Sequence, residues 1–164
     1  MVNLEFDEET GIIRDKATGE RFILVSKTRT EDIFGRLSQI FQSGIEVLLR
    51  ESSRTVGKHI GDLTEEEATA DFNRLLSDYS KKFAQVGFGK IEICELKPEE
   101  AEITFRVRNN FFAEIRDGES TYCSYVGGLV SGIYEALLHL TPSVKEVKCI
   151  GNGDPYCEFQ LAPK

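Results

Sequence analysis

The chain has 164 residues, of which 40% are hydrophobic and 29% are charged, a composition typical of a globular protein and unlike that of a disordered one. We therefore expect one domain over residues 1–164 that buries its own core. Its 28 acidic residues outnumber its 20 basic residues, and the formal charge of −8 argues against nucleic acid or an anionic membrane surface as the main partner.

The N-terminal residues lack the basic start and apolar run of a secretory signal, and no apolar stretch approaches the length of a membrane span. We therefore expect a cytoplasmic protein. In that reducing compartment, four cysteines are more often metal ligands, reactive thiols or core residues than disulfides.

Short apolar runs at 4–6, 12–13 and 22–25 alternate with glycine turn signals, which predicts an N-terminal strand or hairpin. Thr30 can cap a long helix, because acidic residues follow it and apolar residues then recur at helical spacing until a stop near Gly57 or Gly61. Thr64 and Glu67 form a capping-box pattern for a second helix over 64–86.

The second half of the chain predicts an antiparallel sheet with one further helix. The runs 90–96 and 102–108 flank a turn, and the second run alternates apolar with polar residues, as expected for paired strands with one wet face. After a loop region at 109–110, Ser120 can cap a helix that ends before Pro142. The runs 144–150 and 156–161 around a turn-rich segment predict a final hairpin. The expected fold class is α+β, with an antiparallel sheet packed against helices.

Three cysteines are the strongest candidates for a metal site. If the last turn centres on Gly153, Cys149 and Cys157 face each other with Cβ atoms about 5 Å apart. Cys123 falls in the first turn of the third helix, where the helix dipole favours a thiolate. Zinc takes four ligands and prefers such sulfurs, and its fourth ligand could be Glu146, Cys94, His139 or water. The other interpretation is three ordinary buried cysteines.

These residues also carry a family resemblance. The segment from Tyr122 to Gly132, the Glu146-x-x-Cys149 spacing and the run from Gly151 to Phe159 resemble the 4-vinyl-reductase domain family, over a motif region of 120–161. The resemblance implies a zinc site held by Cys123, Glu146, Cys149 and Cys157. It also implies small-molecule sensing, as in sensor domains of aromatic-responsive activators, and a fold similar to that of vesicle-tethering complex subunits.

The proposed zinc ligands contain one geometric conflict. Glu146 and Cys149 differ by three positions and would point to opposite faces of a regular strand. A bulge or a strand end must therefore lie between them, and we rank Glu146 below the three cysteines as a ligand.

Apolar and aromatic residues predict a site for a mainly apolar small molecule, between the first helix and the strand over 102–108. Two adjacent aromatics at 111–112 cannot both face inward from a regular strand, which also favours ligand contact there. The candidate contacts are Phe34, Leu37, Phe41, Ile103, Phe105, Val107, Phe111, Phe112, Tyr122 and Tyr125. The other interpretation is that most of the aromatics are core residues, with the pair at 111–112 as the exception. Zinc would brace the C-terminal hairpin at a separate place.

The expected function is a ligand-binding, sensing or adaptor domain with structural zinc, homodimeric through the long first helix and acting through a partner protein. The alternative is a zinc-dependent enzyme or reductase accessory subunit with an open metal position and Glu146 as a base. An independent reductase is not expected, because no Gly-x-Gly-x-x-Gly pattern follows a strand.

Overall fold

A four-stranded antiparallel sheet forms the centre of the molecule, in a computed structural model that describes residues 3–65, 72–117 and 120–164. Its strands follow the spatial order β4 (Lys90–Lys97), β5 (Glu102–Arg108), β9 (Cys157–Pro163) and β8 (Pro142–Lys148). A 3-10 turn, η1 (Pro98–Glu100), joins the first two strands, and another, η2 (Ile150–Asn152), joins the last two. The two predicted strand pairs are confirmed, and β5 pairs with β9 to unite them.

The two faces of β5 differ in the way the alternating sequence predicts. Ile103, Phe105 and Val107 are at most 1% exposed and belong to the core. On the opposite face Arg106 pairs with Glu158 of the neighbouring strand β9, Nε to Oε2, at 2.6 Å. Because only one face carries apolar side chains, the helices must cover that face.

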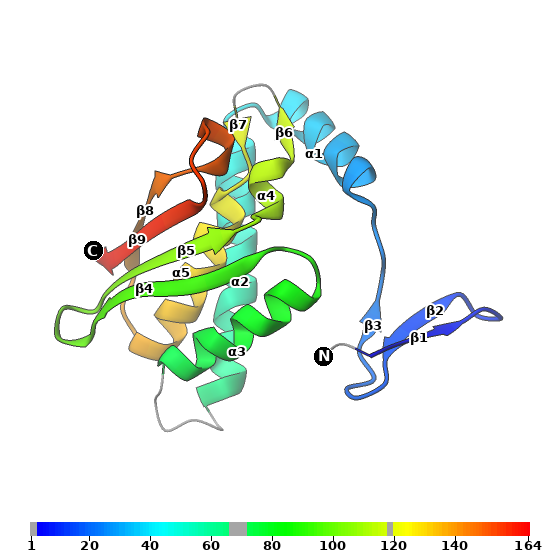
Figure 1. Ribbon diagram of the computed structural model, residues 1–164, viewed down its shortest axis with the longest axis horizontal. Coiled ribbons are helices and arrows are strands. Elements are labelled where there is room, and N and C mark those ends of the chain that lie inside the picture. The colour runs from blue at the N-terminus through cyan, green and yellow to red at the C-terminus, as the bar shows by residue number, and fades with distance from the viewer. Residues whose placement is uncertain (1–2, 66–71, 118–119) are drawn as a thin grey trace.

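Helices cover the apolar face in two layers (Figure 1). The nearer layer is α5 (Ser124–Leu138), and α2 (Gly44–Glu65) packs along it from behind, while α3 (Phe72–Gln85) lies against β4. A Cβ atom at Gly128 or Gly132 would overlap the backbone carbonyl oxygen of Arg50 or Arg54 in α2. The two helices therefore pack backbone against backbone. Along the described ranges, no helix combines the length and apolar character needed to cross a membrane.

A small antiparallel sheet stands apart from this body (Figure 1). It has the order β1 (Leu4–Asp7), β2 (Ile12–Asp15) and β3 (Arg21–Phe22), which confirms the predicted N-terminal hairpin. Residues 23–26 then run without regular structure to α1 (Lys27–Phe41). We call residues 3–26 the arm.

The predicted first helix is wrong in its start and in its continuity. The helix begins after Ser26, whose Oγ accepts a hydrogen bond from the Arg29 N–H at 3.3 Å, and not at Thr30. It breaks at Gln42, where φ is +50°, and α2 starts at Gly44. The left-handed backbone at Gln42 ends α1, yet the apolar spacing continues across it, so periodicity alone cannot reveal the break.

Two other predicted helix starts are also wrong. Thr64 lies inside α2, while its capping-box partner Glu67 lies outside the described residues. Ser120 belongs to a short strand and Cys123 is the N-cap of α5. Residues 109–110 are irregular as predicted, but local structure follows them before α5, namely α4 (Phe111–Glu114), β6 (Arg116–Asp117) and β7 (Ser120–Thr121). That structure displaces the helix start toward the C-terminus.

Candidate metal centre and apolar pocket

Three thiols and one carboxyl group converge where α5, β8 and β9 meet. Cys123 caps α5, Cys149 follows the last residue of β8, and Cys157 is the first residue of β9. All three cysteines are at most 4% exposed. One potential ligand atom from each cysteine and one from Glu146 all lie within 4.8 Å of one another.

A bulge in β8 explains how Glu146 and Cys149 reach the same place. The register of β8 against β9 shifts between Glu146, which faces Phe159, and Lys148, which faces Glu158. β8 then ends at Lys148, so the alternation of side chains between the two faces of the strand does not extend to Cys149. The bulge and the strand end together resolve the conflict that the three-residue spacing poses.

The distances between the sulfurs suit a tetrahedral ion. Cys123 Sγ lies 3.6 Å from Cys149 Sγ and 3.7 Å from Cys157 Sγ. These separations are far longer than a disulfide bond, and none of the three cysteines forms a disulfide. Sulfurs bound to zinc at about 2.3 Å in a tetrahedron are about 3.8 Å apart. Cys123 is therefore spaced from the other two sulfurs as it would be around such an ion.

Crowding and burial favour the protonated forms of Cys123 and Glu146 in the absence of a cation. Hydrogen bonding with Cys149 and Cys157, together with burial, raises the pKa of Cys123 far above its ordinary value. This crowding outweighs the helix dipole that predicts a thiolate there. Glu146 is exposed as a whole residue, but desolvation of its carboxyl group and the nearby Cys149 raise the pKa to about 8. A bound cation would reverse both effects, because it favours the charged forms.

Two polar residues that the sequence analysis missed support the cluster. The Nδ2 group of Asn110 donates to Cys157 Sγ at 3.3 Å and to Cys123 Sγ at 3.5 Å. Asp154 accepts a hydrogen bond from the Cys149 N–H at 2.9 Å and so fixes the turn that carries this thiol. Both lie in segments whose composition indicates only a loop or a turn. Asp154 belongs to the motif run from Gly151 to Phe159, whereas no pattern in the sequence marks Asn110.

The other candidates for the fourth ligand lie elsewhere. Cys94 is exposed on β4, where its Sγ contacts the Glu92 carbonyl oxygen at 3.7 Å. His139 is the C-cap of α5, at the opposite end of that helix from Cys123. The two residues are sixteen positions apart along the helix, which corresponds to about 24 Å. Among the described residues, Glu146 is the candidate whose carboxylate oxygen lies with the three sulfurs.

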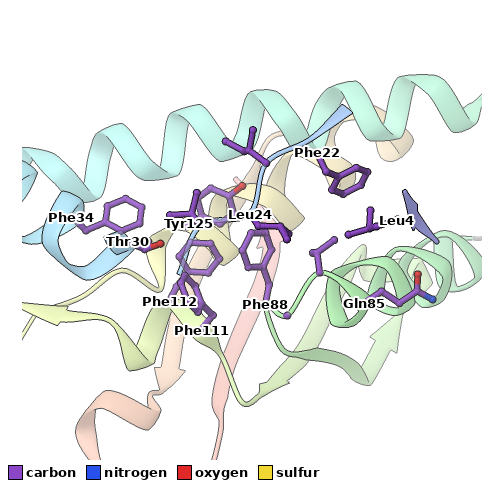
Figure 2. A pocket seen from close by; sticks show the side chains of 14 residues that line it. Leu4, Phe22, Leu24, Thr30, Phe34, Gln85, Phe88, Phe111, Phe112 and Tyr125 are labelled. Atoms are coloured by element: carbon purple, nitrogen blue, oxygen red, sulfur yellow. The ribbon is translucent and has the colours of Figure 1, made fainter. Parts of the chain in front are cut away.

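An apolar pocket of about 640 Å³ lies between the arm and the body (Figure 2). From the body come the rings of Phe88, Phe111, Phe112 and Tyr125, and Phe112 stacks on Tyr125 with ring centroids 4.2 Å apart. The arm contributes apolar side chains that include Leu24. The full lining is Leu4, Phe22, Ile23, Leu24, Val25, Thr30, Phe34, Gln85, Val86, Gly87, Phe88, Phe111, Phe112 and Tyr125.

Four of the ten predicted ligand contacts line this pocket: Phe34, Phe111, Phe112 and Tyr125. The adjacent pair at 111–112 reaches the pocket because it belongs to the short helix α4 and not to a strand. The other six lie in the core or along α1, and they are Leu37, Phe41, Ile103, Phe105, Val107 and Tyr122.

The pocket therefore lies at a different place from the predicted interface of the first helix with β5. Phe105 stacks on Phe159 with centroids 5.0 Å apart, and it is fully buried. Tyr122 stacks on Phe34 at 5.0 Å and shares a hydrogen bond of 2.7 Å with Ser38 Oγ, which fixes α1 to the body. One wall of this pocket comes from the arm, whereas the predicted site has the strand over 102–108 as that wall.

Comparison with known proteins yields distant relatives by sequence. The chain matches no family model. Two uncharacterised proteins of Methanocaldococcus jannaschii are each 26% identical to it, over 125 and 117 residues. The matched regions are 76% and 71% of this chain but only 61% and 64% of those relatives.

Solved structures share the fold at low sequence identity. The phenol-responsive sensory domain of the transcription activator PoxR, solved with phenol, has a TM-score of 0.75 at 17% identity, over 98% of this chain and 84% of that one. A vinyl-4-reductase family protein from M. jannaschii has a TM-score of 0.57 at 15% identity, over 87% and 84%. A trafficking protein particle complex subunit 3 from Naegleria fowleri, covalently bound to palmitic acid, has a TM-score of 0.54 at 15% identity, over 84% and 92%.

These likenesses confirm the predicted α+β fold class and, at the level of the fold, the resemblance to 4-vinyl-reductase domains. A vinyl-4-reductase family protein and a trafficking-complex subunit are both structural neighbours, as the cysteine and glycine motifs imply. The chain has the fold of the vinyl-4-reductase family protein and of the PoxR sensory domain.

Proposed function

We propose that the chain is a sensing domain for a mainly apolar small molecule, which binds in the pocket between the arm and the body. The observation that carries the proposal is the pocket itself, whose volume of about 640 Å³ falls within the range of about 300–1,000 Å³ that small-molecule sites occupy. The shared fold with a phenol-responsive domain supports the same class of ligand.

The pocket lining defines the chemistry of the ligand. None of the fourteen described residues that line it carries a charge, and most are aliphatic or aromatic. The Thr30 and Tyr125 hydroxyl groups are the polar atoms best suited to orient a ligand through one hydrogen bond. An uncharged aromatic compound with a single hydroxyl group matches this lining.

A thermal-shift titration with 2-naphthol tests the pocket. The probe should stabilise the wild type, and Leu24→Ala should weaken its binding, because Leu24 lines the pocket and is 62% exposed, so truncation spares the fold. Leu48→Ala, an equal truncation at an exposed site on α2 away from the pocket, should leave binding unchanged. Equal binding by both variants would place the probe elsewhere.

We also propose that Cys123, Glu146, Cys149 and Cys157 hold one structural zinc ion. The two sulfur separations of 3.6 and 3.7 Å support it, as does the preference of thiolates for zinc over oxygen-seeking cations. The purified protein should contain about one zinc per chain. Cys157→Ser should lose the ion and loosen the C-terminal hairpin. Metal-free protein of undiminished stability would contradict a structural role, and a water in place of Glu146 would favour the enzyme alternative.

A homodimer is the oligomeric state we propose. Ile33 and Ile40 are 55% and 60% exposed and lie seven residues apart on one face of α1, where a second copy would cover them. Sedimentation should show a dimer that Ile33→Glu with Ile40→Glu converts to monomer. Gln39→Glu, which adds a charge at another exposed position of α1, is the control.

The cysteines also bear on where in the cell the protein acts. Three buried cysteines that form no disulfide fit a reducing compartment, so we propose that the protein acts in the cytoplasm. The pocket needs both the arm and the body, so we treat residues 1–164 as one domain. Output would pass through a partner protein.

A further inference from the structure

Asn110 lies between the thiol cluster and the apolar pocket. The backbone turns out of β5 at Asn109, where φ is +50°, and Asn110 follows as the fully buried N-cap of α4. Its Oδ1 accepts a hydrogen bond from the Phe112 N–H at 3.1 Å. Because a backbone N–H can only donate, this bond fixes the orientation of the amide. The NH₂ end must then face the sulfurs.

The NH₂ group offers one hydrogen to each of two sulfurs. It lies within 3.5 Å of both Cys123 Sγ and Cys157 Sγ. Three thiolates and a carboxylate around a divalent cation leave an excess of negative charge, which amide donors stabilise. The Asn110 amide therefore favours the thiolate set that binds a metal over the neutral thiols.

The other end of the same segment forms the pocket wall. The ring of Phe112 lines the pocket against Tyr125, and the Phe112 carbonyl oxygen accepts the Tyr122 N–H at 3.0 Å. Tyr125 lies two residues after Cys123 at the start of α5. Residues 110–112 and 122–125 thus carry contacts to the cluster and to the pocket at once.

We propose that Asn110 is a positioning residue that couples the two sites, so that zinc and the apolar ligand each raise the affinity for the other. The inference rests on the proposed function. With zinc bound, the cysteine sulfurs fix the Asn110 amide, and the amide fixes the Phe112 backbone through its hydrogen bond. The Phe112 ring in turn fixes Tyr125, on which it stacks in the pocket wall. Such coupling is reciprocal, because the free energy that links two binding events is the same in either order.

The test measures the coupling in both directions on the full chain. Zinc affinity is determined by chelator competition with and without saturating 2-naphthol, and naphthol affinity is determined with and without zinc. Both affinities should rise by the same factor, about fivefold or more. A factor of one would overturn the coupling while leaving both sites intact. Failure of zinc or naphthol to bind would overturn the proposed function together with the coupling.

Asn110→Asp isolates the amide donors. The substitution keeps an oxygen that can cap the Phe112 N–H, but it replaces the NH₂ group facing the sulfurs with a second oxygen. Zinc affinity should fall about 10- to 100-fold, and the coupling should vanish. Naphthol affinity of the metal-free protein should be unchanged. Asn152→Asp, which adds the same charge at an exposed position in η2, is the control. Weaker naphthol binding by metal-free Asn110→Asp would instead indicate a structural role and overturn the proposal.

Hydrogen exchange of the wild type supplies a readout that needs no variant. The Phe112 N–H, which donates to Asn110, should exchange more slowly when zinc alone is added. The Thr10 N–H in the arm, which donates to the Asp7 carboxylate, should exchange at the same rate with and without zinc. An unchanged rate at Phe112 would overturn the proposal.

Discussion

Glu146 differs from its three cysteine partners in exposure, since it is exposed while they are buried. Water, itself an oxygen ligand, can replace the Glu146 carboxylate more readily than it can replace a buried sulfur. We therefore expect Glu146→Gln to retain zinc better than Cys149→Ser, by about tenfold in affinity or about 1.4 kcal/mol. Chelator competition measures both variants. Equal losses would show that Glu146 binds the ion as firmly as a thiolate does.

Protons and the metal compete for the same residues, which predicts opposite pH dependences. The pKa of Glu146 is raised from 4.5 to about 8, so in metal-free protein its contribution to stability is full below pH 4.5 and is lost as the pH rises through 8. Zinc must displace those protons, so its binding strengthens over the same range.

Thermal unfolding between pH 5 and pH 8.5, with zinc and with chelator, measures this difference. The stability gained from zinc should grow as the pH rises. Glu146→Gln removes one titrating group and should flatten the metal-free curve. A gain from zinc that stays constant across the range would contradict a protonated cluster.

At the residue scale the sequence predicted the cluster but not its support. Cys123, Glu146, Cys149 and Cys157 belong to a motif with fixed spacing, and the structure brings all four together. Asn110 could not be predicted, because its role depends on the amide orientation that a contact with Phe112 sets. The pocket beside the arm could not be predicted for a related reason, since no local pattern shows where the arm lies.

The helix pair α2 and α5 yields a prediction at the scale of elements. Gly128→Ala should destabilise the protein by about 1–3 kcal/mol, because the new methyl group meets the Arg50 carbonyl oxygen. Gly35→Ala is the matched control, with no other atom within 4 Å of its Cβ, and it should stabilise α1 by about 0.5–1 kcal/mol. Urea unfolding measures both changes. A tolerated Gly128→Ala would mean that the helices can separate.

Strands and helices differ in how far the sequence determines them here. The alternation in 102–108 fixes both the strand and its buried face, because a one-residue slip would expose Phe105. The division of the first helix at Gln42 leaves the apolar spacing intact, so the periodicity predicts a single helix. Only a backbone with positive φ at a non-glycine residue reveals that division.

The arrangement of arm and body gives a prediction for the whole molecule. Chymotrypsin can cleave the arm after Phe22 and Leu24, which line the pocket, and after Phe6, which does not. A ligand that bridges arm and body should slow cleavage at the first two sites, because it suppresses the opened state. Digestion with and without 2-naphthol, followed by mass spectrometry, measures each site. Equal protection at Phe6 would indicate inhibition of the protease itself.

The backbone contact between α2 and α5 has a mechanical consequence. Gly128 and Gly132 have no side chains that could change rotamer to accommodate a displacement, so the two helices form one rigid unit. Cys123 lies at the N-terminal end of α5 and His139 at its C-terminal end. A change in the position of Cys123 would therefore be passed to α2 through this contact and not absorbed within it.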